Sequence, residues 1–207
     1  MSEQEILDLI QNDAERMIII KAVSSLNLTD WWVGAGFVRN KVWEHLFGND
    51  IPTKLNDVDV AYWKSLSEYG MPESEILELI QKEESNPVWD EENKLSEKLR
   101  RILPEYEFEV KNQARMHISK LGDFERQPYN SAAEAIGDWV ETATSVGVRT
   151  TEEGSLLLLA VHGIEDLGNG IVRPIRIERR ARALERAESK GWFSKWPGLR
   201  FEEPWLI

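Results

Sequence analysis

One short stretch, residues 57–62, alternates acidic and apolar side chains and constrains the fold more than any other part of the sequence. Side chains along a β-strand point alternately to its two faces, so Asp57 and Asp59 would project to one side and the apolar side chains between and after them to the other. The pattern therefore predicts a strand over residues 57–63 with one buried face and one acidic face.

Two carboxylates on one face of a strand favour a particular chemistry. They repel each other, and in a partly buried site one of them tends to take up a proton. A divalent cation relieves that repulsion, and Mg²⁺ (or Mn²⁺) prefers one or two carboxylates together with substrate phosphates. The alternative is an edge strand whose acidic face is simply solvated. The strand alone leaves both interpretations open.

A glycine-containing turn precedes this strand. Gly34 and Gly36 lie between an expected short strand, residues 31–33, and an expected helix, residues 37–47. Glycine lets the backbone approach a ligand, and a helix N-terminus offers free N–H groups to phosphate. The alternative is an ordinary tight turn, and the third glycine of the dinucleotide-binding pattern is missing. Turn and acidic strand together place a phosphate cradle beside a metal site, as nucleotidyl transfer requires.

The rest of the chain is patterned as helices and short strands, with no internal repeat and no low-complexity linker. Apolar spacing and capping signals predict helices over residues 3–25, 73–85, 91–103, 131–140 and 175–190. Further strands are predicted over residues 105–111, 146–148 and 156–161. We therefore expect an α/β fold in a single compact unit over residues 1–207.

Charge and cysteine content exclude several classes of protein. The chain carries 25 Lys and Arg against 37 Asp and Glu, a net charge of −12, which disfavours broad binding to nucleic acid or to anionic membranes. It has no cysteine, so disulfides, cysteine-ligated zinc and a thiol nucleophile are excluded. The acidic start is unlike a signal peptide and residues 156–161 are too few to span a bilayer, so a cytoplasmic protein is expected.

The C-terminal part has the opposite charge. Residues 173–200 contain nine Lys or Arg and three Glu. A basic helix here can bind RNA or acidic groups, or it can neutralise the acidic body of its own protein. The overall charge favours the second interpretation.

Several blocks of sequence carry a resemblance to a known family. The blocks are Gly34-Ala35-Gly36 with Asn40 and Trp43, residues 57–62, 110–117 and 141–149, then Gly163, Asp166, Arg173, Lys190, Trp192 and Trp196. On these residues the chain resembles the DNA polymerase β-like nucleotidyltransferase superfamily, and within it a bacterial nucleotidyltransferase-like family. The resemblance implies a nucleotidyltransferase fold, a small mixed β-sheet flanked by helices, with a C-terminal extension.

The resemblance also implies how the chain is divided and where the carboxylates lie. Residues 28–120 would form the nucleotidyltransferase-like core, and residues 121–207 would pack on it and shape an acceptor pocket. Three carboxylates would surround one or two Mg²⁺ ions, two of them Asp57 and Asp59. The third would come from the next strand, where Glu109 is preferred because it lies nearer the matching block, and Glu107 on the same face is the alternative.

Contacts to the nucleotide would come from the turn and from the 110–117 block. Gly34 and Gly36 would admit the triphosphate, with Asn40 beside them. Lys111 and Arg115 could reach phosphates, because Arg suits bidentate contacts and Lys acts as a point charge. An equally weighted alternative is that Arg115 ties buried backbone together.

We therefore expect a metal-dependent transfer of a nucleoside monophosphate from a nucleoside triphosphate, with ATP as the expected donor, to an acceptor that the sequence does not name. One alternative is a nucleotide-binding or regulatory module of the same fold that has lost catalysis. Another is an interaction module that binds protein or RNA through the basic C-terminal helix.

Overall fold

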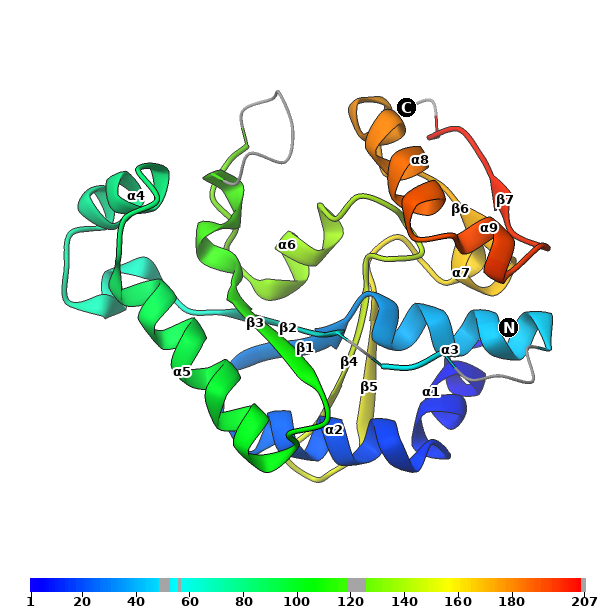
Figure 1. Cartoon of the computed structure of the whole chain (residues 1–207), viewed down its shortest axis with the longest axis horizontal. Helices are drawn as coiled ribbons and strands as arrows, with labels where there is room; N and C mark the ends of the chain where they lie inside the picture. The colour runs from blue at the N-terminus through cyan, green and yellow to red at the C-terminus, as the bar shows by residue number, and fades with distance from the viewer. Residues whose placement is uncertain (49–52, 56, 119–125, 206–207) are drawn as a thin grey trace.

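The computed structural model describes residues 1–48, 53–55, 57–118 and 126–205, and its centre is a mixed β-sheet (Figure 1). The sheet has five strands in the order β3-β2-β1-β4-β5. They are β1 (Asp30–Gly34), β2 (Asp57–Trp63), β3 (Glu107–Asn112), β4 (Val146–Thr150) and β5 (Leu156–Ala160). Only β2 and β3 run parallel, and the other neighbours are antiparallel. This sheet flanked by helices confirms the expected fold class.

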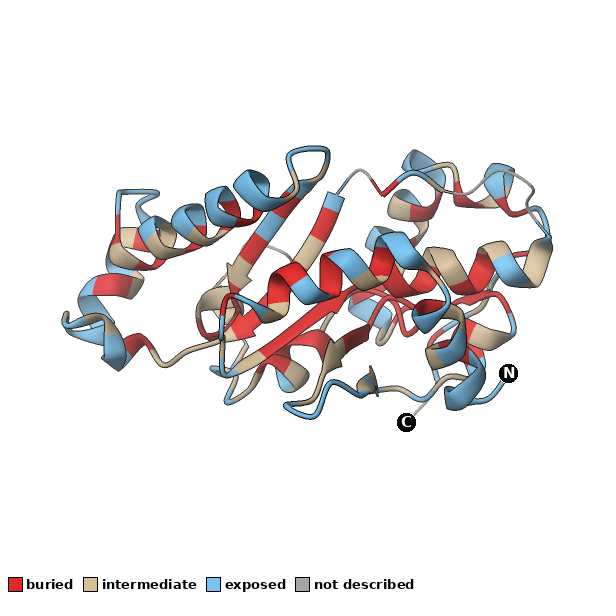
Figure 2. Ribbon diagram, turned by 90° about the horizontal axis from the view of Figure 1, so that it is seen from below, coloured by how far each residue is buried: buried red, intermediate tan, exposed pale blue. Residues whose placement is uncertain are grey.

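Helices cover the two faces of the sheet unequally. One face packs against α1 (Glu3–Gln11), α2 (Ala14–Ser24) and α5 (Pro87–Ile102), and this layer holds the main hydrophobic core. Figure 2 shows the buried residues on the inner sides of these helices and along the strands. The short α6 (Ala132–Gly137) covers part of the other face. The rest of that second face, where the acidic side chains of β2 and β3 lie, is open to ligands.

The remaining elements lie beyond the two ends of the central strands. A small second cluster of apolar residues joins η1 (Leu66–Tyr69), α4 (Glu73–Gln81) and η2 (Gln113–Ile118). At the other end α3 (Gly36–Phe47) follows β1 directly. The C-terminal elements are α7 (Glu165–Gly168), β6 (Ile171–Val172), η3 (Ile177–Arg179), α8 (Arg180–Ser189), α9 (Trp192–Lys195) and β7 (Arg200–Phe201).

Three tryptophans attach the C-terminal part to α3. The buried ring of Trp43 contacts Trp192 and Trp196 edge-on, with ring centroids 5.6 and 5.2 Å apart. Such pairs contribute about 0.5–1.5 kcal/mol each beyond the area that they bury. The expected boundary between residues 120 and 121 lies outside the described residues. No helix in the described part of the chain is long and apolar enough to cross a membrane.

Five of the predicted helices are wrong in their bounds. The helix expected over residues 91–103 begins earlier, at Pro87, and the one expected over residues 131–140 ends earlier, at Gly137. Residues 3–25 form two helices, because the Asp13 carboxylate caps α2 by accepting from the Arg16 backbone N–H at 3.1 Å. The helix expected over residues 73–85 ends at Gln81, and Glu83 has a φ of 59°. The helix expected over residues 175–190 begins only at Arg180, after a 3₁₀ turn.

Candidate active site

The parallel pairing of β2 with β3 brings two acidic strands together on one face. Asp57 lies opposite Glu107, and Asp59 lies opposite Glu109. Paired strands are about 4.8 Å apart, so these four acidic residues form an acidic patch on one face of the sheet. Asp59 is half-buried, whereas the other three are exposed. The alternation predicted for residues 57–63 is therefore present. The acidic residues of β2 lie beside those of the neighbouring strand β3, on the same face of the sheet.

The surroundings of Asp59 favour its protonated form. Burial and the nearby Glu109 carboxylate raise the pKa of Asp59 to about 6, and Lys190 and Arg39 only partly oppose them. This is the behaviour expected of like charges confined in a partly buried site.

The raised pKa of Asp59 predicts a pH-dependent stability. Its pKa is about 6 in the folded chain against an ordinary value of 3.8, so the folded state binds more protons between these values, and the free energy of unfolding falls as pH rises through that window. We expect the metal-free protein to lose on the order of 1–2 kcal/mol, allowing for partial solvent screening. Urea unfolding from pH 4 to 7 measures the loss, and Asp59→Asn should remove it. Parallel pH curves for the two proteins would contradict the assignment.

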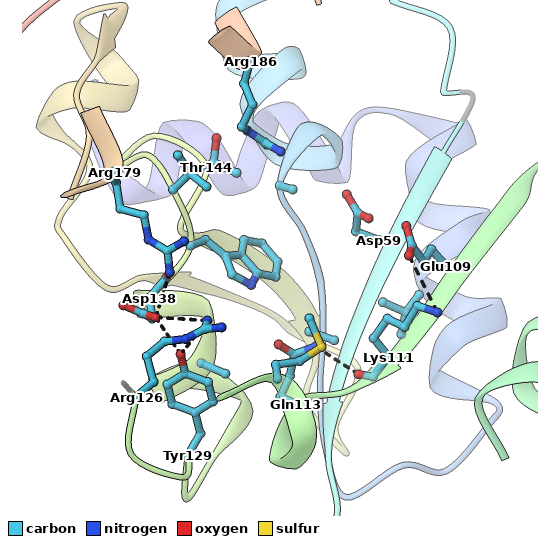
Figure 3. Close-up of a pocket in the computed structure, with 17 residues that line it drawn as sticks. Asp59, Glu109, Lys111, Gln113, Arg126, Tyr129, Asp138, Thr144, Arg179 and Arg186 are labelled. Carbon is cyan, nitrogen blue, oxygen red and sulfur yellow. Dashed lines mark hydrogen bonds and ion pairs between the residues drawn. The ribbon is translucent and has the colours of Figure 1, made fainter. Parts of the chain in front are cut away.

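Two pockets meet at Asp59. The first, which we call the α6 pocket, has a volume of about 230 Å³ and lies between the acidic strands and the α6 region (Figure 3). The second, the α3 pocket, has a volume of about 210 Å³ and lies at the start of α3. Ala35, Asp59 and Arg186 line both pockets. Asp57 lines only the α3 pocket, and Glu109 lines only the α6 pocket. The three predicted carboxylates are thus distributed around the junction of the pockets.

The α3 pocket is strongly cationic. Its lining includes five basic side chains, Arg39, Lys54, Arg186, Lys190 and Lys195. Gly36 and Asn40, both predicted to contact the nucleotide, also line it. The first turn of α3 adds the positive end of a helix dipole. A polyanion such as a triphosphate is the ligand that this pocket suits.

Arg39 is the most constrained of these cations. It is 4% exposed, donates to Thr144 Oγ1 at 2.8 Å and to Asn40 Oδ1 at 2.9 Å, and stacks 4.1 Å from the ring of Trp192. Its Nε has no hydrogen-bond partner among the described residues. Burial lowers its pKa to about 10, partly offset by the charge of Glu141. Arg39 is therefore a buried cation held in the wall of the α3 pocket, and it was not among the residues predicted from the sequence.

The glycine turn has its unusual backbone conformation at its middle residue. Ala35, not a glycine, takes the positive φ, at φ 53° and ψ −122°, and its N–H donates to Val146 O. Such a conformation costs a non-glycine residue about 1–3 kcal/mol. A Cβ on Gly34 would lie 2.8 Å from Trp139, so that glycine is needed for packing, and it lines neither pocket. A Cβ on Gly36 would come no closer than 3.4 Å to Asn40.

The two predicted residues of the 110–117 block separate. Lys111 lines the α6 pocket, with its Nζ 3.8 Å from Glu109 and 3.7 Å from Glu92. Arg115 lines neither pocket; it forms two bonds of 2.7 and 2.8 Å to Glu92, which is 2% exposed. Arg115 thus shares Glu92 with Lys111 but, unlike Lys111, does not reach a pocket.

Residues of the 141–149 block hold two of the arginines that line the pockets. Glu141 is fully buried and accepts a hydrogen bond from Arg186 Nε at 2.9 Å, and Thr144 accepts one from Arg39. Both arginines are thereby held at the walls of the pockets. This explains why an unusual stretch such as Glu-Thr-Ala-Thr is part of the site although only Thr144 itself lines a pocket.

The carboxylates have the chemistry of a metal site, but they do not converge tightly. In the ranges that the structure describes, no three acidic or histidine side chains lie close enough to hold an ion. Oxygen donors of this kind suit Mg²⁺, and their mutual repulsion at Asp59 is the repulsion that a cation relieves. Asp57, Asp59 and Glu109 also lie on the same face of the paired strands β2 and β3. The residues present therefore fit a divalent ion.

The basic C-terminal residues are largely paired within the molecule. Arg173 binds Asp166 and Glu202, and Arg180 binds Glu203 at 2.8 Å. Asp138 binds Arg126, Arg176 and Arg179. These contacts support the interpretation that the basic segment neutralises acidic parts of its own chain.

A profile of a family described as nucleotidyltransferase matches residues 21–201. The chain belongs to this nucleotidyltransferase family. One solved structure, described as a CCA-adding enzyme head domain, is 28% identical with a TM-score of 0.75, over 98% of this chain and 96% of that one. Another, a CCA-adding enzyme with CTP, is 13% identical with a TM-score of 0.54 and shows a similar fold. This nucleotidyltransferase covers 44% of that second chain. No curated protein matches.

Proposed function

We propose that the protein transfers a nucleoside monophosphate from a nucleoside triphosphate to an acceptor hydroxyl, with a divalent ion at the acidic patch. One observation carries the proposal: Asp59 lies at the junction of a cationic pocket and a second pocket in which acidic and basic side chains are nearly balanced. Nucleotidyl transfer needs this arrangement, because the phosphates must be neutralised beside the point at which the acceptor oxygen attacks.

The residues take separate roles in this proposal. Asp57 and Asp59 would hold Mg²⁺ (or Mn²⁺), and Glu109, rather than Glu107, would complete the set, because Glu109 lines a pocket and Glu107 lines neither. The ion would neutralise charge on the phosphates. Arg39, with Gly36 and Asn40 at the start of α3, would bind the triphosphate.

The reaction balances without a further reactant. The acceptor oxygen forms a bond to the α-phosphorus, the bond to the bridging oxygen breaks, and pyrophosphate leaves. The acceptor proton would pass to Glu109, which lies on the α6 side of the junction. Residues 121–207 would supply the acceptor side, since α6 and α8 contribute walls of that pocket.

Binding of the four nucleoside triphosphates to the protein identifies the donor. ATP is the donor expected from the sequence, and CTP is included because one structural neighbour was determined with CTP. Isothermal titration calorimetry with all four nucleoside triphosphates, with and without Mg²⁺, tests the proposal. We expect at least one to bind and to need Mg²⁺ for full affinity. A chain that binds nucleotide but never releases pyrophosphate in an acceptor screen would support the non-catalytic alternative instead.

Arg39→Gln is expected to weaken binding of the nucleoside triphosphate by about 10- to 100-fold, the range for losing a hydrogen bond to a charged group. The guanidinium lies in the wall of the cationic α3 pocket and has an unpartnered Nε among the described residues. The same calorimetric titration measures the change. Arg180→Gln is the matched control, because Arg180 pairs with Glu203 on the surface and lines neither pocket. Equal effects of the two substitutions would contradict the role of Arg39.

A further inference from the structure

The α6 pocket contains a buried hydrogen-bond acceptor that the chain does not satisfy. Gln113 is 3% exposed, and its Nε2 donates to the Lys111 backbone carbonyl at 3.1 Å. That carbonyl can only accept, so the amide nitrogen must face it and the amide oxygen faces the pocket. Oε1 has no hydrogen-bond partner in the described part of the chain. Buried carbonyl groups are rarely left unpaired, so this oxygen points to a ligand that donates an N–H or O–H.

The walls around Gln113 suit a small, flat ligand. Met116, Ala135, Trp139 and Val140 contribute apolar surface, and the pocket volume is about 230 Å³. Pockets for drug-sized molecules are larger, about 300–1,000 Å³, so this one holds a molecule of nucleoside size at most. Figure 3 shows Gln113 facing the cluster of Arg126, Tyr129 and Asp138 across the pocket. The lining thus combines an apolar part with polar and charged side chains, and a few well-placed polar groups are the usual way in which a pocket orients a small ligand.

The in-line geometry of phosphoryl transfer assigns the α6 pocket to the acceptor. In phosphoryl transfer the attacking and the leaving oxygen lie roughly in line on opposite sides of the phosphorus. If the leaving pyrophosphate occupies the cationic α3 pocket, the attacking oxygen must come from the opposite side of Asp59. That side is the α6 pocket, which Glu109 lines and Asp57 does not.

We propose that the α6 pocket binds the acceptor as a small planar molecule of nucleoside size, oriented by a hydrogen bond to Gln113 Oε1, with its hydroxyl toward Asp59 and Glu109. The inference rests on the proposed function, because it takes the α3 pocket as the phosphate site. A long RNA acceptor is disfavoured, since the chain has a net charge of −12 and Arg173, Arg179 and Arg180 of its basic segment are paired internally.

Calorimetry on the full chain tests this assignment with adenosine, cytidine, guanosine and uridine as probes. Each is titrated with Mg²⁺ and a saturating α,β-methylene triphosphate analogue. We expect at least one nucleoside to bind while the analogue stays bound. Gln113→Leu should weaken that nucleoside about tenfold, as expected for a lost hydrogen bond, and leave the analogue unchanged. Gln81→Leu, the same change on the exposed surface of α4, is the matched control and should alter neither affinity.

Thermal melting shows whether Gln113→Leu is folded. If it is not, Gln113→Met takes its place, and the same tenfold weakening of nucleoside binding is expected from it.

Each other outcome overturns the inference. Displacement of the analogue by the nucleoside would show that the α6 pocket holds the base of the donor. No nucleoside binding at millimolar concentration, or equal binding to the Gln113 variants, would reject a nucleoside-sized acceptor read by Gln113. A 12-nucleotide RNA that binds at least about 100-fold more tightly, with a steep salt dependence, would indicate a polymer acceptor. Failure of the proposed function can be told apart from failure of this inference, because the unmutated protein would then not bind the triphosphate analogue at all.

Discussion

Asp59→Asn is expected to reduce nucleotidyl transfer about 10³-fold or more, the scale of removing a charge-stabilising group from a reacting centre. Asp59 is the carboxylate that lines both pockets, and in the proposal it holds the ion that neutralises the phosphates. Asparagine has nearly the same shape, so the sheet should stay folded. Pyrophosphate release at saturating nucleotide and Mg²⁺ measures the change once an acceptor is found.

The matched control for this variant is Glu107→Gln. Glu107 lies on the same acidic face, opposite Asp57, but it is exposed and lines neither pocket. Its loss should change turnover by no more than about twofold, as for a surface substitution, whereas Glu109→Gln should act like Asp59→Asn. A large effect of Glu107→Gln with none for Glu109→Gln would assign Glu107, not Glu109, as the third carboxylate of the metal site. Undiminished turnover in Asp59→Asn would reject the metal-site proposal itself.

The acidic strand could be predicted from the sequence because its alternation is local. Asp57 and Asp59 alternate with Val58 and Val60, and a period of two residues is typical of strands. The pairing partner could not be predicted so directly, because the register of Asp59 opposite Glu109 depends on parallel packing of segments 50 residues apart. The resemblance placed Glu109 near the site, and the strand pairing in the structure gives that placement a physical basis.

The break in the first helix and the strained turn show two limits of local patterns. Apolar spacing continues through Asn12 and Asp13, but an aspartate that caps a backbone N–H and binds Lys41 at 2.7 Å ends one helix and begins the next. At the turn, the pattern marks two glycines, but the positive φ falls on Ala35 between them, and Gly34 is needed where Trp139 packs against the strand end.

Arg39 was missed for a related reason. An arginine in the first turn of a helix is usually assigned to solvent, because long charged side chains are seldom fully buried. Only the folded chain shows Trp43 and Trp192 enclosing its guanidinium. What could not be predicted is that α9, more than 150 residues along the chain, closes over the start of α3 and turns a surface cation into a wall of the pocket.

Arg115→Met is expected to lower the free energy of unfolding by about 3–5 kcal/mol, the cost of removing one partner of a buried ion pair. Glu92 is 2% exposed and accepts two bonds from Arg115, at 2.7 and 2.8 Å, and one from the Asn112 backbone N–H at 2.8 Å. Without Arg115, its nearest cation is Lys111 at 3.7 Å. The carboxylate would remain buried with incomplete compensation, and the pairing of α5 with β3 would be weakened.

Thermal melting and urea unfolding of Arg115→Met measure this cost, and a chain of this size should melt roughly 6–20 °C lower. Arg101→Met is the matched control: Arg101 pairs with Glu97 at 3.6 Å on the same helix as Glu92, but its side chain is 82% exposed, so its loss should cost no more than about 0.5 kcal/mol. At a temperature where both variants are folded, nucleotide affinity should equal that of the unmutated protein. A normal melting curve with nucleotide affinity weakened tenfold or more would instead assign Arg115 to phosphate, as the sequence alone allowed.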